Sequence, residues 1–286
     1  MSTFFYQRLS IEQSNWFASD GKELRGSILK GNTRGEAVTQ LVEHSTRIVS
    51  KQEFYNGRKE SERPSVLELL KDNCSNKKIT LDALHLTPET VTYIEGEGEG
   101  GIFLIGVKEN QKELLDTLVS ISSTKKPINQ YCPEPEKGNG RVDTRKYESF
   151  DLKNVCFDKR WSNANFQTVI KVERERYNCK AKTISCETAY YISNEKTQAN
   201  DTTHELFNAV KDHWNVETNN HIRDVSLNED ALKSKFPELS HNMATCRTIV
   251  LNAIYQLKPN NIKELIDEFS DNILTLFKAF SKFNFL

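Results

Sequence analysis

The sequence lacks a long hydrophobic run, because no window approaches the roughly eighteen consecutive apolar residues that identify a membrane-spanning helix. Its first residues also lack the basic segment followed by an apolar segment that a secretory signal requires. These absences argue against membrane insertion and secretion, and they predict a cytoplasmic location. The chain has 286 residues, of which 37% are hydrophobic, so it is long enough to bury a core as one large domain or two small ones.

Cysteine spacing typical of zinc ribbons is also absent. The six cysteines, at positions 74, 132, 156, 179, 186 and 246, include no Cys-x-x-Cys pair. Without a secretory signal, we expect free thiols in a reducing cytoplasm, most of them acting as small buried hydrophobic side chains.

The chain carries little net charge, at −1, so its sum does not indicate nucleic-acid binding. The distribution of charge is uneven. Residues 137–183 contain twelve Lys and Arg against six Asp and Glu, a local charge of +6 that leaves −7 for the rest of the chain. A phosphate backbone could contact this block, but a solvated, strand-rich surface would give the same count.

The first half of the sequence alternates between strand-like and helix-like patterns. The run 102–107 is continuously apolar, as expected of a strand buried on both faces. Thr87-Pro88 predicts a helix start, because proline is favoured at the first helical position. We expect strands at 37–43, 48–54, 79–82 and 102–107, and helices at 65–71, from Thr87 onward and at 111–122.

The second half changes character twice. Residues 127–140 have the composition of a loop, and residues 141–193 predict a β-rich, basic insertion with strands at 142–147, 154–157, 167–173 and 188–192. Thr202-x-x-Glu205 is a capping box that predicts the start of a helix. Beyond it, apolar residues at helical spacing predict a helical C-terminal third.

Three carboxylates stand out as candidate metal ligands: Asp20 before Gly21, Asp82 at the end of the strand-like run 79–82, and Glu217 in a stretch with helical spacing. Hard cations such as Mg²⁺ prefer a few carboxylates together with substrate phosphates. Two such metals about 4 Å apart can activate the attacking oxygen and stabilise the leaving oxygen of a phosphodiester. We therefore predict that the three groups converge on a two-metal site for Mg²⁺ or Mn²⁺.

Each carboxylate also has a structural alternative. Asp-Gly pairs form turns, and Asp82 could cap a helix. Glu217 lies in the pattern His213-x-x-x-Glu217-x-x-x-His221, which shares one helix stripe. That stripe could chelate a transition metal, although its histidines are eight positions apart rather than four as in HExxH, or it could be purely structural with Trp214 in the core.

The motifs around these carboxylates resemble bacterial insertion-sequence DDE transposases of the H-repeat-associated type. The resemblance runs in order from about Trp16 to Leu257, through Asp20-Gly-Lys22, Ile79-Thr-Leu-Asp82, Gly101-to-Gln111, Lys137-Gly-Asn-Gly-Arg141, Tyr191-Ile-Ser193, His213-Trp214, Asn220-to-Val225, Glu229-Asp-Ala231, Arg247 and Leu251-Asn252. It implies an RNase H-like α/β core with a mixed central sheet, in which Asp20, Asp82 and Glu217 are the catalytic carboxylates and bind the metals. The implied reaction is cleavage of double-stranded DNA at insertion-sequence ends and strand transfer into target DNA, by a homo-oligomer in a synaptic complex.

The expected DNA contacts combine residues beside the first carboxylate, the basic block and the helix that carries Glu217. They are Lys22, Arg25, Arg141, Arg145, Lys146, Lys211, His213 and Trp214, with His221 and Asp224 as further groups near the metals. Lys22 and Arg25 could instead be solvated. Two positions depart from the family: Lys211 replaces an arginine, which removes bidentate phosphate recognition, and Asn139 replaces a histidine.

Relatives in this family carry a small helical domain before the Asp-Gly-Lys motif. We therefore expect residues 1–19 to be its remnant, residues 20–257 to form the transposase domain with its insertion at 141–193, and residues 258–286 to form a helical tail. The alternative function is a truncated, non-catalytic remnant that binds DNA or full-length transposase, located like the enzyme at the bacterial nucleoid.

Overall fold

The computed structural model describes residues 16–71, 77–97, 100–138, 140–199, 201 and 204–281, except for the side chains of Lys59, Glu97 and Phe280. These residues form two compact units. The first unit comprises Met1–Lys71 with Asp212–Leu286, and the second comprises Asp72–Lys211. The predicted capping residue Thr202 and the family departure at Asn139 lie outside the described residues.

The first unit contains an antiparallel sheet of three strands, β1 (Trp16–Glu23), β2 (Ala37–Glu43) and β3 (Val49–Tyr55). Every residue of the central strand β2 is buried. In β1, Asp20 is paired with Gln40 and Gly21 with Thr39. The expectation that Asp20 precedes a turn is therefore wrong, because the Asp-Gly pair lies within a strand.

Helices complete the first unit: α2 (Lys59–Leu70), α6 (Trp214–Val225), α7 (Pro237–Gln256), α8 (Ile262–Asp271) and α9 (Ile273–Ser281). The helix predicted at 65–71 begins earlier, at Lys59. The prediction missed its first turns because they are polar and carry no apolar periodicity. Val216 of α6 packs with Ala18, Val42 and Val49 of the sheet in one buried cluster. The C-terminal third is helical, as predicted.

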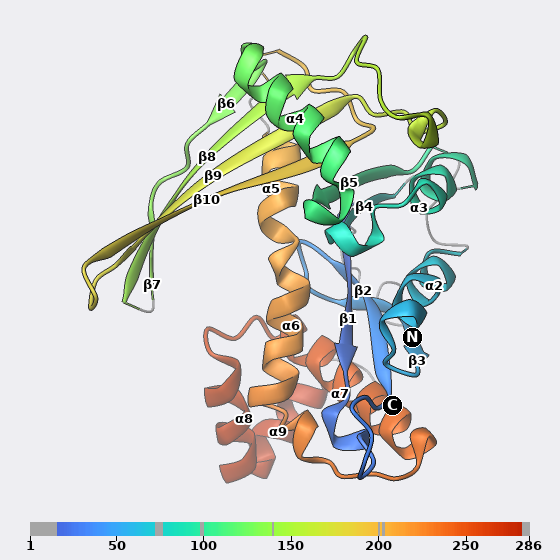
Figure 1. Cartoon of the computed structure of the whole chain (residues 1–286). Helices are drawn as coiled ribbons and strands as arrows, with labels where there is room; N and C mark the ends of the chain where they lie inside the picture. The colour runs from blue at the N-terminus through green and yellow to red at the C-terminus, as the bar shows by residue number, and fades with distance from the viewer. Residues whose placement is uncertain are drawn as a thin grey trace. The chain divides into compact units, whose positions relative to one another are not determined.

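The second unit contains a mixed sheet. Strand β4 (Lys78–Leu81) is parallel to β5 (Ile102–Val107). Beyond β5 each strand is antiparallel to the one before it, in the order β10 (Thr183–Ser193), β9 (Thr168–Asn178), β8 (Arg141–Asp151) and β6 (Asn129–Tyr131) (Figure 1). Strand β7 (Glu136–Gly138) also pairs with β8. The helices are α3 (Pro88–Thr92), α4 (Lys112–Thr124) and α5 (Glu205–Asp212), whose last residue belongs to the first unit. The predicted strand 102–107 and the helix start at Pro88 are confirmed.

The region predicted as an insertion of short strands has a different form. Strands β8, β9 and β10 are eleven residues long, residues 154–157 are not a strand, and the predicted loop 127–140 contains β6 and β7. Moreover, β10 pairs directly with β5, so these strands continue the sheet. Residues 183–188 of β10 are all exposed. The apolar pattern that predicts strands is therefore missing from this half of β10, so the sequence predicted only the other half.

None of the helices in the described part of the chain combines the length and the apolar character needed to cross a bilayer.

Candidate active site

Strand β1 and helix α6 meet along a row of matched side chains. Every second residue of a strand is about 6.6 Å further along, and every fourth residue of a helix is about 6.0 Å further along. The two elements therefore stay in step over three contacts. In the first, Ala18 and Val216 belong to one buried cluster. In the second, the side-chain amide of Asn220 donates to Asp20 Oδ2 at 3.2 Å. In the third, the ammonium group of Lys22 lies 2.5 Å from the carboxylate of Asp224.

Glu217 lies beside this row. It is in the first turn of α6, is exposed, and is three positions before Asn220, so the two residues are neighbours on the helix surface. Each residue of the predicted stripe His213, Glu217 and His221 is thus displaced by one position along α6 from the residues that contact β1. His221 is exposed. The structure places Asp20 in contact with the residue one helical turn from Glu217.

The opposite face of β1 leaves little room for a side chain at Gly21. A Cβ atom at this position would lie 2.6 Å from Tyr55 Oη and 2.9 Å from Glu62 Cδ. Burial, together with the carboxylates of Glu62 and Asp20, raises the pKa of Tyr55, which therefore stays neutral beside them. The glycine of the Asp-Gly pair allows this close approach, whereas the sequence suggested a turn.

A cavity of about 310 Å³ opens beside Gly21 and beside Asn220, the residue that hydrogen-bonds Asp20. Gly21, Tyr55, Glu62, Asn220 and Asp224 are among the residues that line it, so it is bounded by the same strand and helix. Within the described residues, Asn220 Oδ1 is buried without a hydrogen-bond partner. A buried oxygen of this kind favours a cation or a water molecule as its neighbour.

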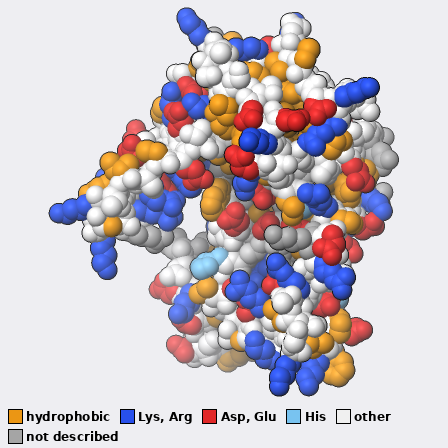
Figure 2. Space-filling view, in the orientation of Figure 1, with side chains coloured by type: hydrophobic (Ala, Val, Ile, Leu, Met, Phe, Trp, Pro, Cys, Tyr) orange, Lys and Arg blue, Asp and Glu red, His pale blue; other side chains and the backbone are white. Residues whose placement is uncertain are grey.

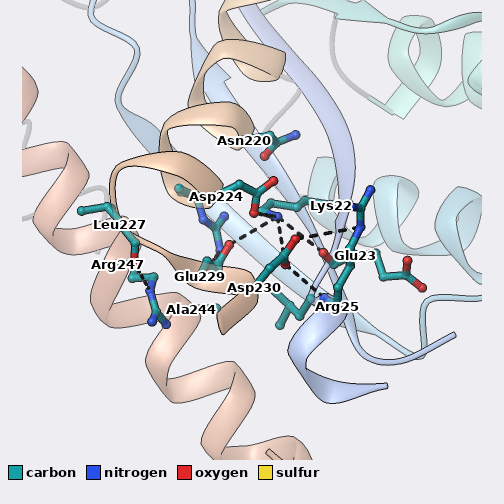
Figure 3. A network of polar contacts seen from close by, with 12 residues as sticks. Lys22, Glu23, Arg25, Asn220, Asp224, Leu227, Glu229, Asp230, Ala244 and Arg247 are labelled. Carbon is teal, nitrogen blue, oxygen red and sulfur yellow. Dashed lines mark hydrogen bonds and ion pairs between the residues drawn. The ribbon is translucent and has the colours of Figure 1, made fainter. Parts of the chain in front are cut away.

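Lys22 is held inside a network of acidic side chains at the end of α6 (Figure 3). Its side chain is only 5% exposed, and its Nζ lies 2.5 Å from Asp224 Oδ1, 3.6 Å from Glu229 Oε2 and 3.8 Å from Asp230 Oδ1. The fully buried Arg223 is 2.7 Å from the other oxygen of Glu229. The ammonium group of Lys22 is therefore engaged inside the protein, which corrects the expectation that it contacts DNA phosphate.

Asp224 has a clear role in this network, because it pairs with Lys22 and thereby holds the end of α6 on β1. Arg25 is different. Its side chain is 73% exposed, and its guanidinium is 3.9 Å from Asp230. Arg25 is accessible to DNA, and its predicted contact stays a prediction.

Asp82 occupies the predicted position after β4, in the second unit. Parallel strands β4 and β5 end at the same edge, where open sheets place ligands, and Lys108 after β5 lies 2.9 Å from Asp82 Oδ1. The Asp82 side chain is 46% exposed and makes no capping hydrogen bond to the short helix that follows it. The alternative that Asp82 is a helix cap is therefore wrong.

Tyr191 of β10 lies in the electrostatic field of Asp82. Burial, reinforced by Tyr147 and Asp82, raises the pKa of Tyr191 to about 12. The hydroxyl is thus neutral at physiological pH and can donate a hydrogen bond.

Asp20 and Glu217 belong to the first unit and Asp82 to the second. Within the described residues, no group of three or more His, Cys, Asp or Glu side chains is arranged to hold a metal ion. The convergence of the three carboxylates on one metal site stays a prediction.

The basic residues of β8 are neutralised by neighbouring carboxylates. Arg145 lies 2.6 Å from Glu136 and 3.7 Å from Asp143, and Arg141 lies 3.8 Å from Asp143. A hydrogen bond from Arg176 and the charges of the nearby arginines lower the pKa of Asp143, which is therefore ionised. Some basic side chains of the +6 block are thus engaged in ion pairs, and Arg145 pairs with a carboxylate from outside the block, that of Glu136.

Two other predicted DNA contacts are paired in the same way: Lys146 lies 2.7 Å from Glu148, and Lys211 lies 2.5 Å from Glu136. Lys and Arg side chains are visible at the free end of the long strands, where Lys180 and Lys182 are exposed (Figure 2). Because exposed ion pairs are weak, the DNA contacts of Lys146 and Lys211 stay predictions.

His213 and Trp214 begin α6. The Trp214 side chain is 51% exposed, so the alternative that it packs in the core is wrong. His213 is partly buried, and its charge, together with the larger effect of burial, lowers the pKa of the neighbouring His44 to about 3.

Four residues near the carboxylates were not assigned from the sequence: Tyr55, Lys108, Tyr191 and Asn220. Three of them had a signal, because Lys108, Tyr191 and Asn220 lie in segments that carry the family resemblance. Tyr55 lies in no such segment, and it reaches β1 through the pairing of strands, which leaves no local pattern.

No protein-family model matches the chain. The chain is 27% identical over 261 residues to "Putative protein YbfL" and 26% identical over 261 residues to "H repeat-associated putative transposase YhhI", both of Escherichia coli (strain K12). Each match covers 86% of this chain and 65% of the relative, so the chain spans just under two thirds of the length of these proteins.

Among solved structures, the chain matches one described as "Cryo-EM structure of piggyBac transposase synaptic complex with hairpin DNA (SNHP)". The TM-score is 0.49 at 13% identity, and the match covers 86% of this chain and 47% of that one.

Proposed function

We propose that the chain is the catalytic core of a DDE transposase with an RNase H-like fold, which cuts double-stranded DNA at insertion-sequence ends and joins it to target DNA. The observation that carries the proposal is the register of α6 on β1, which holds Glu217 one helical turn from the residue that hydrogen-bonds Asp20. The sequence similarity to an H-repeat-associated transposase supports the reaction class.

The proposed metal ligands are Asp20, Asp82 and Glu217, for two Mg²⁺ or Mn²⁺ ions. The donor set fits these metals, because all three groups are carboxylates and hard cations prefer oxygen ligands. The buried oxygen of Asn220 beside Asp20 also suits a cation or a water molecule that such a cation carries. When bound, two metals supply activation of the attacking oxygen and stabilisation of the leaving oxygen.

The remaining residues position these carboxylates. The amide of Asn220 fixes one oxygen of Asp20, and the Lys22–Asp224 pair holds α6 on β1, so Glu217 is presented from a fixed helix face. Tyr55 remains protonated beside Asp20 and therefore adds no competing negative charge. At the second carboxylate, Lys108 offsets the charge of Asp82 and is exposed enough to contact a phosphate.

Nicking of supercoiled plasmid DNA tests this function. With Mg²⁺ or Mn²⁺, the wild-type protein should nick the plasmid, and Asp20→Asn, Asp82→Asn and Glu217→Gln should each abolish nicking, because each change is nearly isosteric but removes a ligand charge. Asp116→Asn on the exposed face of α4 is the matched control and should nick at the wild-type rate.

Circular dichroism and urea unfolding should show that all four variants fold. Wild-type nicking by any of the three site variants would remove that residue from the metal site. Loss of folding in one of them would instead assign it a structural role.

A further inference from the structure

A second, larger cavity lies in the first unit, and Asp20, Asp82 and Glu217 are not among the residues that line it. Its volume is about 1090 Å³, and it is formed by the turn between β2 and β3, the C-terminal ends of α6 and α7, and the segment that leads into α8. Three cations line it: Arg47, Lys258 and Lys263. The other described lining residues are polar or apolar, and they include neither Asp nor Glu.

These cations differ from the predicted basic residues in their pairing. In the described part of the chain, Arg47, Lys258 and Lys263 form no ion pair, whereas Arg141 and Arg145 face Asp143 and Glu136. All three are also exposed. The cavity therefore brings together three exposed cations that pair with no carboxylate of the described residues.

Two of the cations stand where the backbone favours glycine. Arg47 has φ 61° and Lys258 has φ 49°, both in the left-handed region that side chains with a Cβ rarely adopt. Arg47 closes the turn through its N–H to Glu43 O at 2.9 Å, and Lys258 ends α7 through its N–H to Tyr255 O at 3.1 Å. Long cationic side chains at two positions suited to glycine, beside one cavity, indicate that the side chains serve a purpose there.

The main chain at Arg47 is also held in place. Its carbonyl oxygen accepts from Asn219 Nδ2 at 2.9 Å, and Asn219 Oδ1 accepts from the hydroxyl of Tyr255 at 2.6 Å. The backbone that carries this cavity-lining side chain is therefore fixed. At the start of α8, the side chain of Asn261 accepts hydrogen bonds from the backbone N–H groups of Lys263 and Glu264. Because these N–H groups are already satisfied, a ligand in the cavity would contact the cationic side chains rather than the helix end.

We propose that this cavity binds the phosphate backbone of duplex DNA, as a contact additional to the metal site. The proposal rests on the proposed function, which supplies the DNA. Three cations that form no ion pair, in a cavity that neither Asp nor Glu lines, match a run of phosphates. Contacts of this kind hold DNA without reading its sequence.

The test is the salt dependence of binding to a short fluorescent DNA duplex, measured by anisotropy in KCl without divalent metal. The double variant Arg47→Gly/Lys258→Gly should fold normally, because glycine adopts both backbone conformations without strain. Its log–log salt slope should fall by about two, and that of Lys263→Gln by about one, since each lost phosphate contact removes about one unit.

Two matched controls isolate charge from backbone effects. Asn228→Gly introduces glycine at another left-handed position, φ 51°, without removing a charge, and Lys235→Gln removes an exposed lysine that does not line the cavity. Both should retain the wild-type slope. Replacing KCl by potassium phosphate at equal ionic strength should have no additional effect; selective displacement by free phosphate would show a site for a single small anion and would overturn the proposal.

The outcomes separate this proposal from the proposed function. If the wild-type protein nicks and binds DNA but the double variant keeps the wild-type slope, the cavity proposal is wrong and the catalytic proposal stands. If the wild-type protein binds no DNA, both are wrong. If Asp20→Asn abolishes nicking with an unchanged slope while the double variant lowers the slope, both are supported.

Discussion

The ammonium group of Lys22 on β1 lies 2.5 Å from the carboxylate of Asp224 on α6, in a network where Lys22 is 5% exposed. Lys22→Met would leave Asp224, Glu229 and Asp230 without their shared cation. Removing one partner of a buried pair leaves an uncompensated charge, so we expect the free energy of unfolding to fall by about 3 kcal/mol. Urea unfolding followed by tryptophan fluorescence measures this loss.

Arg25→Ala is the matched control for Lys22→Met, because Arg25 is 73% exposed and lies at the edge of the same network. Its effect should be below about 0.5 kcal/mol. Equal effects of the two substitutions would show that the buried position of Lys22 does not contribute to stability.

Gly21→Ala should destabilise the first unit, because the new Cβ would lie 2.6 Å from Tyr55 Oη and 2.9 Å from Glu62 Cδ. Overpacking of this kind costs about 1–3 kcal/mol. Adding Tyr55→Phe removes the closest atom and should restore part of the loss in urea unfolding. Gly138→Ala, where no atom lies within 4 Å of the added Cβ, is the control and should be nearly neutral. A Gly21→Ala protein as stable as wild type would mean that the tyrosine moves freely.

His44 should make the protein less stable in mild acid. Its pKa falls from 6.5 to about 3 in the folded protein, so between these values the unfolded chain binds a proton that the folded chain does not. Stability therefore falls as the pH drops below 6.5, by about 2 kcal/mol between pH 7 and pH 5 for this group. His44→Phe keeps an aromatic ring beside Trp16 and should lack this component of the pH dependence.

Urea unfolding at both pH values measures the difference between wild type and His44→Phe, which cancels the titration of the carboxylates. The exposed His221, replaced by Gln, is the control and should retain the wild-type pH dependence. The same loss between pH 7 and pH 5 in His44→Phe would place the acid sensitivity elsewhere.

Lys108→Gln should make the proposed metal site easier to fill. Lys108 lies 2.9 Å from Asp82 and competes with a metal for its carboxylate. Because an exposed pair contributes up to about 1 kcal/mol, the Mn²⁺ concentration for half-maximal nicking should fall by up to about fivefold. Lys112→Gln, an exposed lysine on α4, should leave it unchanged. A higher metal requirement in Lys108→Gln would instead assign Lys108 to phosphate binding.

Much of the local structure followed from the sequence. The continuous apolar run at 102–107 predicted β5, and Thr87-Pro88 predicted the start of α3, where the Thr87 side chain accepts from Thr90 N–H. Asp82 was expected at a strand end and lies there. These features depend on residues close in the chain, so their pattern is present before folding.

The long strands β8 to β10 were predicted only in part. Residues 147–150 of β8 and 168–170 of β9 are buried without interruption, whereas residues 183–188 of β10 are exposed throughout. Pairing with a neighbouring strand satisfies their backbone without burying side chains, so the apolar pattern that predicts strands is absent from them.

The candidate site divides in the same way. The sequence by itself identified Asp20, Asp82 and Glu217 as an unusual set of carboxylates and predicted the strand end at Asp82 and the helix at Glu217. Only the tertiary structure decided that Lys22 is buried, that Gly21 faces Tyr55, that Asp143 neutralises the arginines of β8, and that Arg47 and Lys258 face one cavity. The physical reason is distance along the chain: Asp20 meets Asn220 across 200 positions, and such contacts are set by the packing of whole elements, which no local pattern of residues records.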